Sequence, residues 1–429
     1  MWEQSVPEGL HPGEGTHVGA VREGLQPMGR AQFGEVCGGL SPLQNTPSLE
    51  WSYLSLSEWQ CLSVTVVPRW VQIGCHADDL SYAAELRRPP LAVKKFKVEK
   101  NTMEVSSLLV GLIYVIMPKE STLGQISVTI KEAVQAPFFR HGETDISAWQ
   151  STIRQYPAPW AEPATENIIL TVPAADVHHM DNPESLLSIW NKKMNAIGRR
   201  AAISATLPRP ERMVADVQVS HDCQDCLWFT FPADSIHAGY PVMHQLESVT
   251  EMVDVQLSSC LPPPPPPKKK ANGLWGAIHE LGHNQQQPEW EFPPRTTEAT
   301  YSLWSVYVNE TVLGIPRDKA HKALALELRK KRIQDYIENG AQLKDWEVFT
   351  ALETCLQPQE AFGKEAFIEI FSEYQNMSEL PDDNDSKMNL WAETFSRLAW
   401  GWPIKESLSQ QRAVSFPSWS DDPMKQYIS

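Results

Sequence analysis

The chain has 429 residues, of which 42% are hydrophobic and 21% are charged, and its 37 Lys and Arg against 53 Asp and Glu give a net charge of −16. This composition is typical of a globular protein of two or three domains and excludes a fibre or a wholly disordered chain. The acidic balance also argues against a general nucleic-acid-binding protein, whose affinity depends on neutralising phosphates.

Nothing in the sequence predicts membrane insertion or secretion. A spanning helix needs roughly 20 apolar residues, and the best candidate, 108–117, ends at Pro118 and suits a buried strand. The N-terminus lacks the basic region and apolar core of a secretory signal. Seven cysteines, an odd number, favour reduced thiols. We therefore expect a cytoplasmic protein without a transmembrane segment.

The first third of the chain contains two kinds of sequence. Residues 1–48 are rich in Gly, Pro, Glu and Gln without periodicity, which predicts a flexible segment. Residues 49–140 contain short β-rich runs bounded by turn residues, which predict a small β-sandwich accessory domain. These runs are 62–67, 70–74, 108–117 and 126–130.

One stretch of the predicted sandwich is basic. It contains Arg87, Arg88, Lys94, Lys95, Lys97 and Lys100. It is either a solvated strand face or a surface for a partner or for anionic lipid.

Residues 144–400 have mixed α/β patterning that becomes helical beyond Gly273, and residues 401–429 are assigned to a C-terminal tail. The periodicity predicts strands at 167–172 and 213–219 and helices at 185–199, 318–339, 361–374 and 387–398. Gly340 is a candidate helix C-cap, and Pro358 is expected to kink or break the helix around it. The fold class is therefore α+β and multidomain: a β-sandwich followed by a mixed α/β-to-helical domain.

Two segments resemble inserts. The first, near 221–231, contains Cys223 and Cys226 in a CxxC pattern; with no second CxxC in the chain, a loop is favoured over a zinc knuckle. The second, near 258–272, contains six prolines, Pro262–Pro267, followed by three lysines. Such a run is either a solvated insertion or a polyproline II rod that an SH3- or WW-type domain could bind.

The candidate catalytic motif is His279-Glu280-Leu281-Gly282-His283, an HExxH sequence. On a helix, residues four apart share a face, so both imidazoles can reach one metal ion. Glu280 lies beside this face, where it can take a proton from water rather than act as a ligand.

A third ligand follows at a suitable distance along the chain. Pro293 and Pro294 turn the chain, and Thr296 or Thr297 can cap a second helix with Glu298 in its first turn. Two histidines, one carboxylate and an open position are typical of a catalytic zinc ion, and Ser302 could orient a ligand. The alternative is that the histidines are partly buried core residues and Glu298 is a helix-start charge.

The residues around the motif carry a family resemblance. The sequences HELGHNQQQPEWEFPP (279–294), TTEAT (296–300) and VYVNETVLGIPR (306–317) resemble the enhancin-type, mucin-directed zinc metallopeptidases of the gluzincin group. They resemble more closely the vertebrate TRP (melastatin-type) channel-associated factors. Further matching stretches are VQIGCHADDL (71–80), GLIYVIMP (111–118), PAPWAE (157–162), NIILTVP (167–173), RMVADVQ (212–218), HAGYPVM (237–243) and TALETCLQPQEAFG (350–363).

The resemblance covers about residues 50–404 and implies a metallopeptidase domain that binds one zinc ion. It also implies a regulator that binds a TRP melastatin-type channel, affects its delivery to the plasma membrane and its gating, and lies peripherally at that membrane. Should the domain be catalytic, it would be a zinc endopeptidase with Glu280 as general base. An oxyanion donor would then be needed, for which Tyr240 or His237 are candidates and a core aromatic is the alternative for Tyr240.

Overall fold

The structure is a computed structural model that describes residues 51–56, 60–64, 70–100, 102–116, 128–207, 209–220, 222–223, 226–227, 229–230, 236–239, 273–292 and 295–399. All of them belong to one compact unit, Leu43–Ser429. The predicted segments 1–48 and 401–429, the proline run Pro262–Pro267 and the candidate residue Tyr240 lie outside the described residues.

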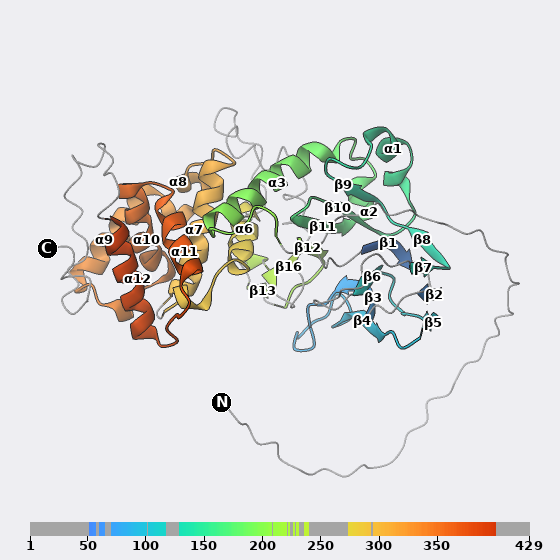
Figure 1. Cartoon of the computed structure of the whole chain (residues 1–429), viewed down its shortest axis with the longest axis horizontal. Helices are drawn as coiled ribbons and strands as arrows, with labels where there is room; N and C mark the ends of the chain where they lie inside the picture. The colour runs from blue at the N-terminus through green and yellow to red at the C-terminus, as the bar shows by residue number, and fades with distance from the viewer. Residues whose placement is uncertain are drawn as a thin grey trace, which may run out of the picture. The chain divides into compact units, whose positions relative to one another are not determined.

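The N-terminal strands form two antiparallel sheets (Figure 1). The five-stranded sheet has the order β4-β3-β6-β1-β8, formed by Ala92–Lys97, Trp70–His76, Leu112–Ile116, Trp51–Leu56 and Ala133–Gln135. The three-stranded sheet has the order β5-β2-β7, formed by Thr102–Val105, Gln60–Val64 and Val128–Ile130. Val71 and Ile113 of the larger sheet share a hydrophobic cluster with Val105 and Val128 of the smaller one. The packing of these two sheets face to face as a β-sandwich stays a prediction.

The predicted strand 108–117 is shorter than expected. Strand β6 begins at Leu112, and Leu108 is 97% exposed in the preceding loop. At Gly111 the chain passes Gly74, and a Cβ on Gly111 would lie 2.5 Å from the Gly74 Cα. This close approach fits only glycine, and the apolar residues before it lie beyond the sheet.

A six-stranded mixed sheet follows, with the order β15-β16-β12-β11-β10-β9. Its strands are Phe229–Thr230, Ile236–Gly239, Glu211–Asp216, Ile168–Pro173, Trp160–Ala164 and Phe138–Arg140. Strand β12 pairs in parallel with β11 and β16, and it ends at Asp216, earlier than the predicted strand 213–219. In the CxxC segment, strands β13 (Asp222–Cys223) and β14 (Cys226–Leu227) pair antiparallel, and residues 224–225 between them lie outside the described residues.

Helices pack around and beyond this sheet. They are α1 (Ile146–Ser151), α2 (Ala174–Val177) and α3 (Pro183–Arg200), then α6 (Gly273–His283), α7 (Thr296–Thr311), α8 (Arg317–Ala320), α9 (Leu326–Glu338), α10 (Val348–Phe362), α11 (Ala366–Asn376) and α12 (Asn384–Ala399). Short 3-10 turns lie at Ile153–Gln155, Pro288–Trp290, Lys322–Leu324 and Leu343–Asp345. The helices from α6 onward run from yellow to red in Figure 1. One hydrophobic cluster joins sheet and helices and includes Trp190, Met213, Leu281, Trp304 and Phe371.

Two helix predictions are wrong, and the break that is one of the two outcomes expected at Pro358 is absent. The predicted helix 318–339 is divided into α8, a 3-10 turn and α9, because His321 is extended and its ring packs against Trp275 and Phe349 at centroid distances of 4.8 and 4.7 Å. The predicted helix 361–374 spans the end of α10 and the start of α11, since Gly363 adopts a φ of 110°. Pro358 does not break α10, where its ring is buried and tertiary packing outweighs the missing hydrogen bond.

Buried polar contacts join the five-stranded sheet to the mixed sheet. Arg88 Nε and Nη2 donate to the two carboxylate oxygens of Asp216 at 2.7 and 2.9 Å. Tyr114 donates to Glu162 at 3.1 Å, and Arg212 pairs with the same carboxylate. Arg88 is therefore not part of a solvated strand face, although Lys94 and Lys95 are exposed.

Candidate metal centre

Helices α6 and α7 bring three candidate ligands together. His279 and His283 lie one turn apart on α6, and their Nε2 atoms are 3.2 Å from each other. Glu298, in the first turn of α7, places Oε2 at 3.1 Å from His279 Nε2. Among the described residues, these three offer ligand atoms that all lie within 4.8 Å of one another. The arrangement is a half-exposed cluster of two imidazoles and one carboxylate.

The two helices approach closely because of a glycine inside the motif. A Cβ on Gly282 would lie 3.3 Å from the Cβ and Cγ of Trp304 and 3.4 Å from the Tyr301 carbonyl oxygen. Leu281 and Ile278 are buried in the core on the same helix. The apolar positions of α6 therefore anchor it, and Gly282 allows α7 to approach the histidines.

The connection between these helices differs from the prediction at the start of α7. Helix α6 ends at His283, and Trp290 in the following 3-10 turn stacks on Phe371 at 4.0 Å. The N-cap of α7 is Arg295, with a φ of 66°, and it makes no side-chain cap bond. Thr296 and Thr297 do not cap the helix; Thr296 bonds to the Phe292 backbone and Thr297 donates to Glu291 at 3.0 Å.

Burial controls the electrostatics of the cluster. Burial, together with the neighbouring His279, lowers the pKa of His283 to about 3, so this imidazole is neutral at pH 7. Burial and the charge of Glu298 raise the pKa of Glu280 to about 8. The contact with His279 is the main cause that lowers the pKa of Glu298, which is therefore ionised at pH 7. A neutral imidazole and an ionised carboxylate are the protonation states that bind metal ions.

Two residues of α7 surround the histidines. Ser302 Oγ lies 3.4 Å from His279 Nδ1 and donates to the Glu298 carbonyl at 3.0 Å. The ring of Tyr301 lies against His283 at a centroid distance of 3.3 Å, and its hydroxyl donates to Glu291 at 2.6 Å. Tyr301 was not predicted; its position three residues after Glu298, on the same face of a helix, is the signal that points to it.

Glu280 lies beside the cluster, as the pattern predicts. Its Oε2 is 3.8 Å from His283 Nε2, and its side chain is 13% exposed. His237 belongs to β16, opposite Val214 of β12.

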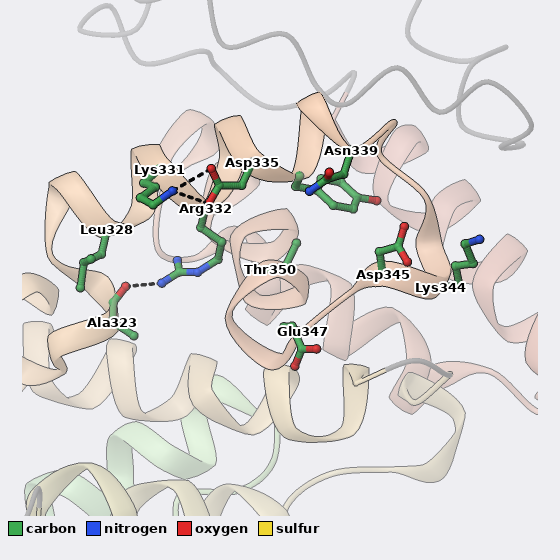
Figure 2. A pocket seen from close by; sticks show the side chains of 11 residues that line it. Ala323, Leu328, Lys331, Arg332, Asp335, Asn339, Lys344, Asp345, Glu347 and Thr350 are labelled. Atoms are coloured by element: carbon green, nitrogen blue, oxygen red, sulfur yellow. Dashed lines mark hydrogen bonds and ion pairs between the residues drawn. The ribbon is translucent and has the colours of Figure 1, made fainter.

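A separate hollow lies over α9 and α10, away from the histidines in sequence (Figure 2). It has a volume of 860 Å³, and its charged lining side chains are Lys331, Arg332, Asp335, Lys344, Asp345 and Glu347. Lys331 bonds to Asp335 at 2.8 Å, and Arg332 donates to the Ala323 carbonyl at 2.6 Å. Since Lys331 and Arg332 already bond within the protein, we assign this hollow no ligand.

The family model for peptidase M60, enhancin and enhancin-like proteins matches residues 132–400. The model for the N-terminal domain of M60-like peptidases matches residues 63–131. In the part of the chain that the structure describes, every helix is too short or too polar to span a bilayer.

Two similar relatives are channel-associated factors. TRPM8 channel-associated factor 2 of Bos taurus is 48% identical over 368 residues, covering 83% of this chain and 38% of the relative. TRPM8 channel-associated factor 1 of Homo sapiens is 45% identical over 368 residues, covering 83% of this chain and 37% of the relative. The chain thus spans less than two fifths of the length of these relatives. The resemblance to the channel-associated factors that the motifs indicated is confirmed.

Solved structures share the fold. The M60 catalytic domain of Clostridium perfringens ZmpC, solved with the sialyl T antigen, has a TM-score of 0.57 at 12% identity and covers 85% of this chain and 74% of its own. A conserved Bacillus anthracis protein of unknown function has a TM-score of 0.63 at 18% identity and covers 85% of this chain and 72% of its own. The mixed α/β architecture with its helical half is therefore that of M60 domains. The chain belongs to the peptidase M60, enhancin and enhancin-like family.

Proposed function

We propose that this chain is a regulatory protein that binds a TRP melastatin-type channel through an M60 peptidase-like domain holding one zinc ion. The observation that carries the proposal is the 48% identity to a TRPM8 channel-associated factor over 368 residues. The zinc site rests on the side-chain cluster of α6 and α7. The proposed effect on the channel is a change in its delivery to the plasma membrane and in its gating.

The donor set fits zinc. His279, His283 and Glu298 offer two nitrogens and one oxygen, which are the ligands of catalytic zinc sites in the related peptidase classes. Burial keeps His283 neutral, which is the form of an imidazole that binds a metal ion. Ser302 beside His279 Nδ1 would fix the orientation of that ring.

We also propose a two-domain organisation for this chain. We assign residues 49–140 to a β-sandwich accessory domain and residues 144–400 to the peptidase-like domain. Residues 71–133 have a hydrophobic cluster of their own, which supports the division, while β9 (Phe138–Arg140) pairs with β10 and a third cluster joins the two parts. A cytoplasmic location at the inner face of the plasma membrane follows from the proposed channel partner.

A metal measurement tests the zinc site directly. Purified wild-type protein is expected to contain about one zinc ion per chain, as three protein ligands of this type bind zinc tightly. His283→Ala should lose the zinc, whereas His179→Ala, which removes an exposed histidine, should retain it. Zinc-free wild-type protein, or zinc retained in His283→Ala, would contradict the assignment.

Channel binding needs a separate test. The wild-type chain is expected to co-precipitate with a melastatin-type channel and to change its surface density on co-expression. An unchanged surface density together with no co-precipitation would rule out the channel role, whatever the zinc content is.

A second candidate function is zinc endopeptidase activity, and the position of Glu280 favours it. A bound zinc ion supplies Lewis-acid polarisation of a scissile carbonyl. Glu280, within 3.8 Å of His283 Nε2 and largely buried, would in its ionised form accept a proton from water and deliver it to the leaving amine; a bound cation beside it would favour that form over the neutral one. Tyr240 is the proposed oxyanion donor.

Glu280→Gln separates binding from catalysis. The variant is expected to keep zinc and to lose cleavage of a peptide or glycoprotein panel by roughly a hundredfold or more. Glu338→Gln, an exposed change on α9, is the control and should cleave at the wild-type rate. Equal cleavage by Glu280→Gln and wild type would exclude the proposed role of Glu280.

A further inference from the structure

Exposed hydrophobic side chains are concentrated at one end of the five-stranded sheet. Of the nine large hydrophobic residues that are exposed among the described residues, six lie there. They are Tyr82, Leu86, Leu91, Leu108, Val110 and Val217. Scattered apolar residues are normal on a protein surface, but a concentration of this kind marks an interaction site.

The sheet pairing brings the loops that carry these residues together. Strand β3 ends at His76, which pairs with Ala92 at the start of β4, and Ile73 pairs with Ile113 near the start of β6. The β3–β4 loop (77–91) and the β5–β6 loop (106–111) therefore leave the same end of the sheet. Lys94, on β4 just after the first loop, donates from Nζ to the Ser106 carbonyl oxygen at 3.4 Å and links the start of β4 to the second loop.

Val217 is held beside the first of these loops. The neighbouring Gln218 accepts a hydrogen bond from the Arg87 backbone N–H and donates to the Glu85 carbonyl, both at 2.8 Å. The exposed residues of all three segments thus form one surface, which we call the loop surface.

The charge next to the loop surface has the opposite sign to the charge of the chain. Residues 77–97, which comprise the whole β3–β4 loop and β4, contain five Lys or Arg and three Asp or Glu (Asp78, Asp79 and Glu85), in a chain with a net charge of −16. Arg88 is paired with Asp216, and Lys97 is paired with Glu99 at 3.3 Å, whereas Arg87, Lys94 and Lys95 are exposed. Residues 105–111 carry no charge at all.

We propose that the loop surface docks onto an anionic phospholipid membrane. Tyr82 and Leu108 would enter the headgroup and acyl boundary, while Lys94 and Lys95, which are nearer the loop end of β4 than Lys97, face the charged lipid headgroups. Each basic residue near an anionic leaflet adds attraction, and inserted apolar side chains add a hydrophobic contribution.

The form of the loop surface favours a membrane over a protein groove. Tyr82 and Leu108 are each 97% exposed, so their side chains protrude from separate loops and contact almost nothing. Protein-binding anchors are more often set in a packed patch with complementary pockets. Protruding apolar tips with basic residues behind them match the layered chemistry of a bilayer surface.

Vesicle sedimentation tests the proposal with the full chain. The wild-type protein is expected to sediment with vesicles of phosphatidylcholine containing about 30 mol% phosphatidylserine, and much less with phosphatidylcholine alone. Raising the salt concentration should weaken the binding, because it screens the lysines. Tyr82→Ser combined with Leu108→Ser should lower the partition coefficient roughly tenfold or more.

Matched variants isolate the cause. Leu326→Ser with Ile337→Ser removes two exposed hydrophobic residues from α9 instead and should bind like wild type. Lys94→Gln with Lys95→Gln should reduce the preference for phosphatidylserine. Thermal melting of each variant checks the fold, and the exposure of the changed residues predicts little effect on it.

Three results would overturn the proposal. They are no sedimentation of the wild type with anionic vesicles, wild-type binding by the loop variant, or an equal loss in the α9 control. If the wild type does not bind vesicles but the Tyr82→Ser, Leu108→Ser variant no longer co-precipitates with the channel, the loop surface binds protein instead. This inference rests on the proposed location at the membrane. Because the vesicles contain no channel, a negative vesicle result leaves the channel proposal untouched, and the two failures can be distinguished.

Discussion

At the residue scale, Lys193 on α3 is a charged group in the core. Its side chain is fully buried, and its Nζ lies 4.0 Å from the Trp190 ring centroid. Burial lowers the pKa of Lys193 from 10.5 to about 7. Below pH 7 both the folded and unfolded chains carry the proton, and the folded state bears the desolvation penalty. Between pH 7 and about 10 the unfolded chain binds more protons, so this group makes stability rise with pH.

Lys193→Met should therefore stabilise the protein in a pH-dependent way. We expect an increase of roughly 1–4 kcal/mol in the free energy of unfolding at pH 6, partly offset by the lost ammonium–ring contact, and little increase at pH 10. Urea unfolding at both pH values measures the difference. Lys192→Met changes the exposed neighbouring lysine and should show no such pH dependence. An equal effect of Lys193→Met at both pH values would mean that this lysine is not neutral in the folded protein at high pH.

Also at the residue scale, Tyr301 and Glu291 show what the motif pattern omits. The HExxH spacing identifies His279 and His283, but it contains no information on the ring that covers His283. The Tyr301–Glu291 hydrogen bond joins α7 to the connection that follows α6. Such support around a metal site depends on contacts and is not encoded in a short local pattern.

At the element scale, the packing of α6 on α7 sets the distance between the ligands. Gly282→Val would place branched carbons where even a Cβ lies 3.3 Å from Trp304. We expect α6 to be displaced, with a loss of roughly 1–3 kcal/mol in the free energy of unfolding and weaker zinc binding. Thermal melting with and without added zinc measures both effects.

The control for Gly282→Val is Gln334→Val, which introduces the same β-branched residue at an exposed site on α9. This variant should lose only a few tenths of a kcal/mol and should keep its response to zinc. A Gly282→Val protein that binds zinc like wild type would show that the helix separation tolerates a larger side chain.

Also at the element scale, the sequence predicts the apolar side of a helix better than the residues at which the helix begins and ends. The predicted helix 185–199 is present as α3, where the Asn182 side chain accepts from the Glu184 N–H at the N-terminus. Its apolar period is local and strong. By contrast, α7 begins after Arg295 in a left-handed conformation because the Thr296 hydroxyl is bonded to the Phe292 backbone. Local capping rules favour Thr at this position, but the connection between the helices uses its hydroxyl differently.

At the scale of the whole molecule, the contact between the five-stranded sheet and the mixed sheet depends on a buried ion pair. The side chains of Arg88 and Asp216 are 8% and 0% exposed. Arg88→Ala would leave the Asp216 carboxylate buried without this partner, so we expect a loss of roughly 3–5 kcal/mol in the free energy of unfolding. Calorimetry should also show the transition of the accessory strands separating from that of the peptidase-like part.

Arg87→Ala is the matched control for this prediction, because Arg87 is exposed and bonds to Gln218 through its backbone N–H. Its effect on stability should be within about 0.5 kcal/mol. A similar small effect for Arg88→Ala would mean that the two sheets are held together mainly by the apolar cluster around Leu112, Val214 and Ala158.

The sequence alone determined the features that repeat locally. The alternation in β3, the apolar period of α3 and the four-residue spacing of His279 and His283 each depend on residues within one or two turns or strand repeats. Tertiary structure alone decided where helices break, at His321 and Gly363, and that Pro358 stays inside one. It also decided that Arg88 is buried and that three distant segments form the loop surface. These features depend on contacts between residues far apart in the chain, which no local period encodes.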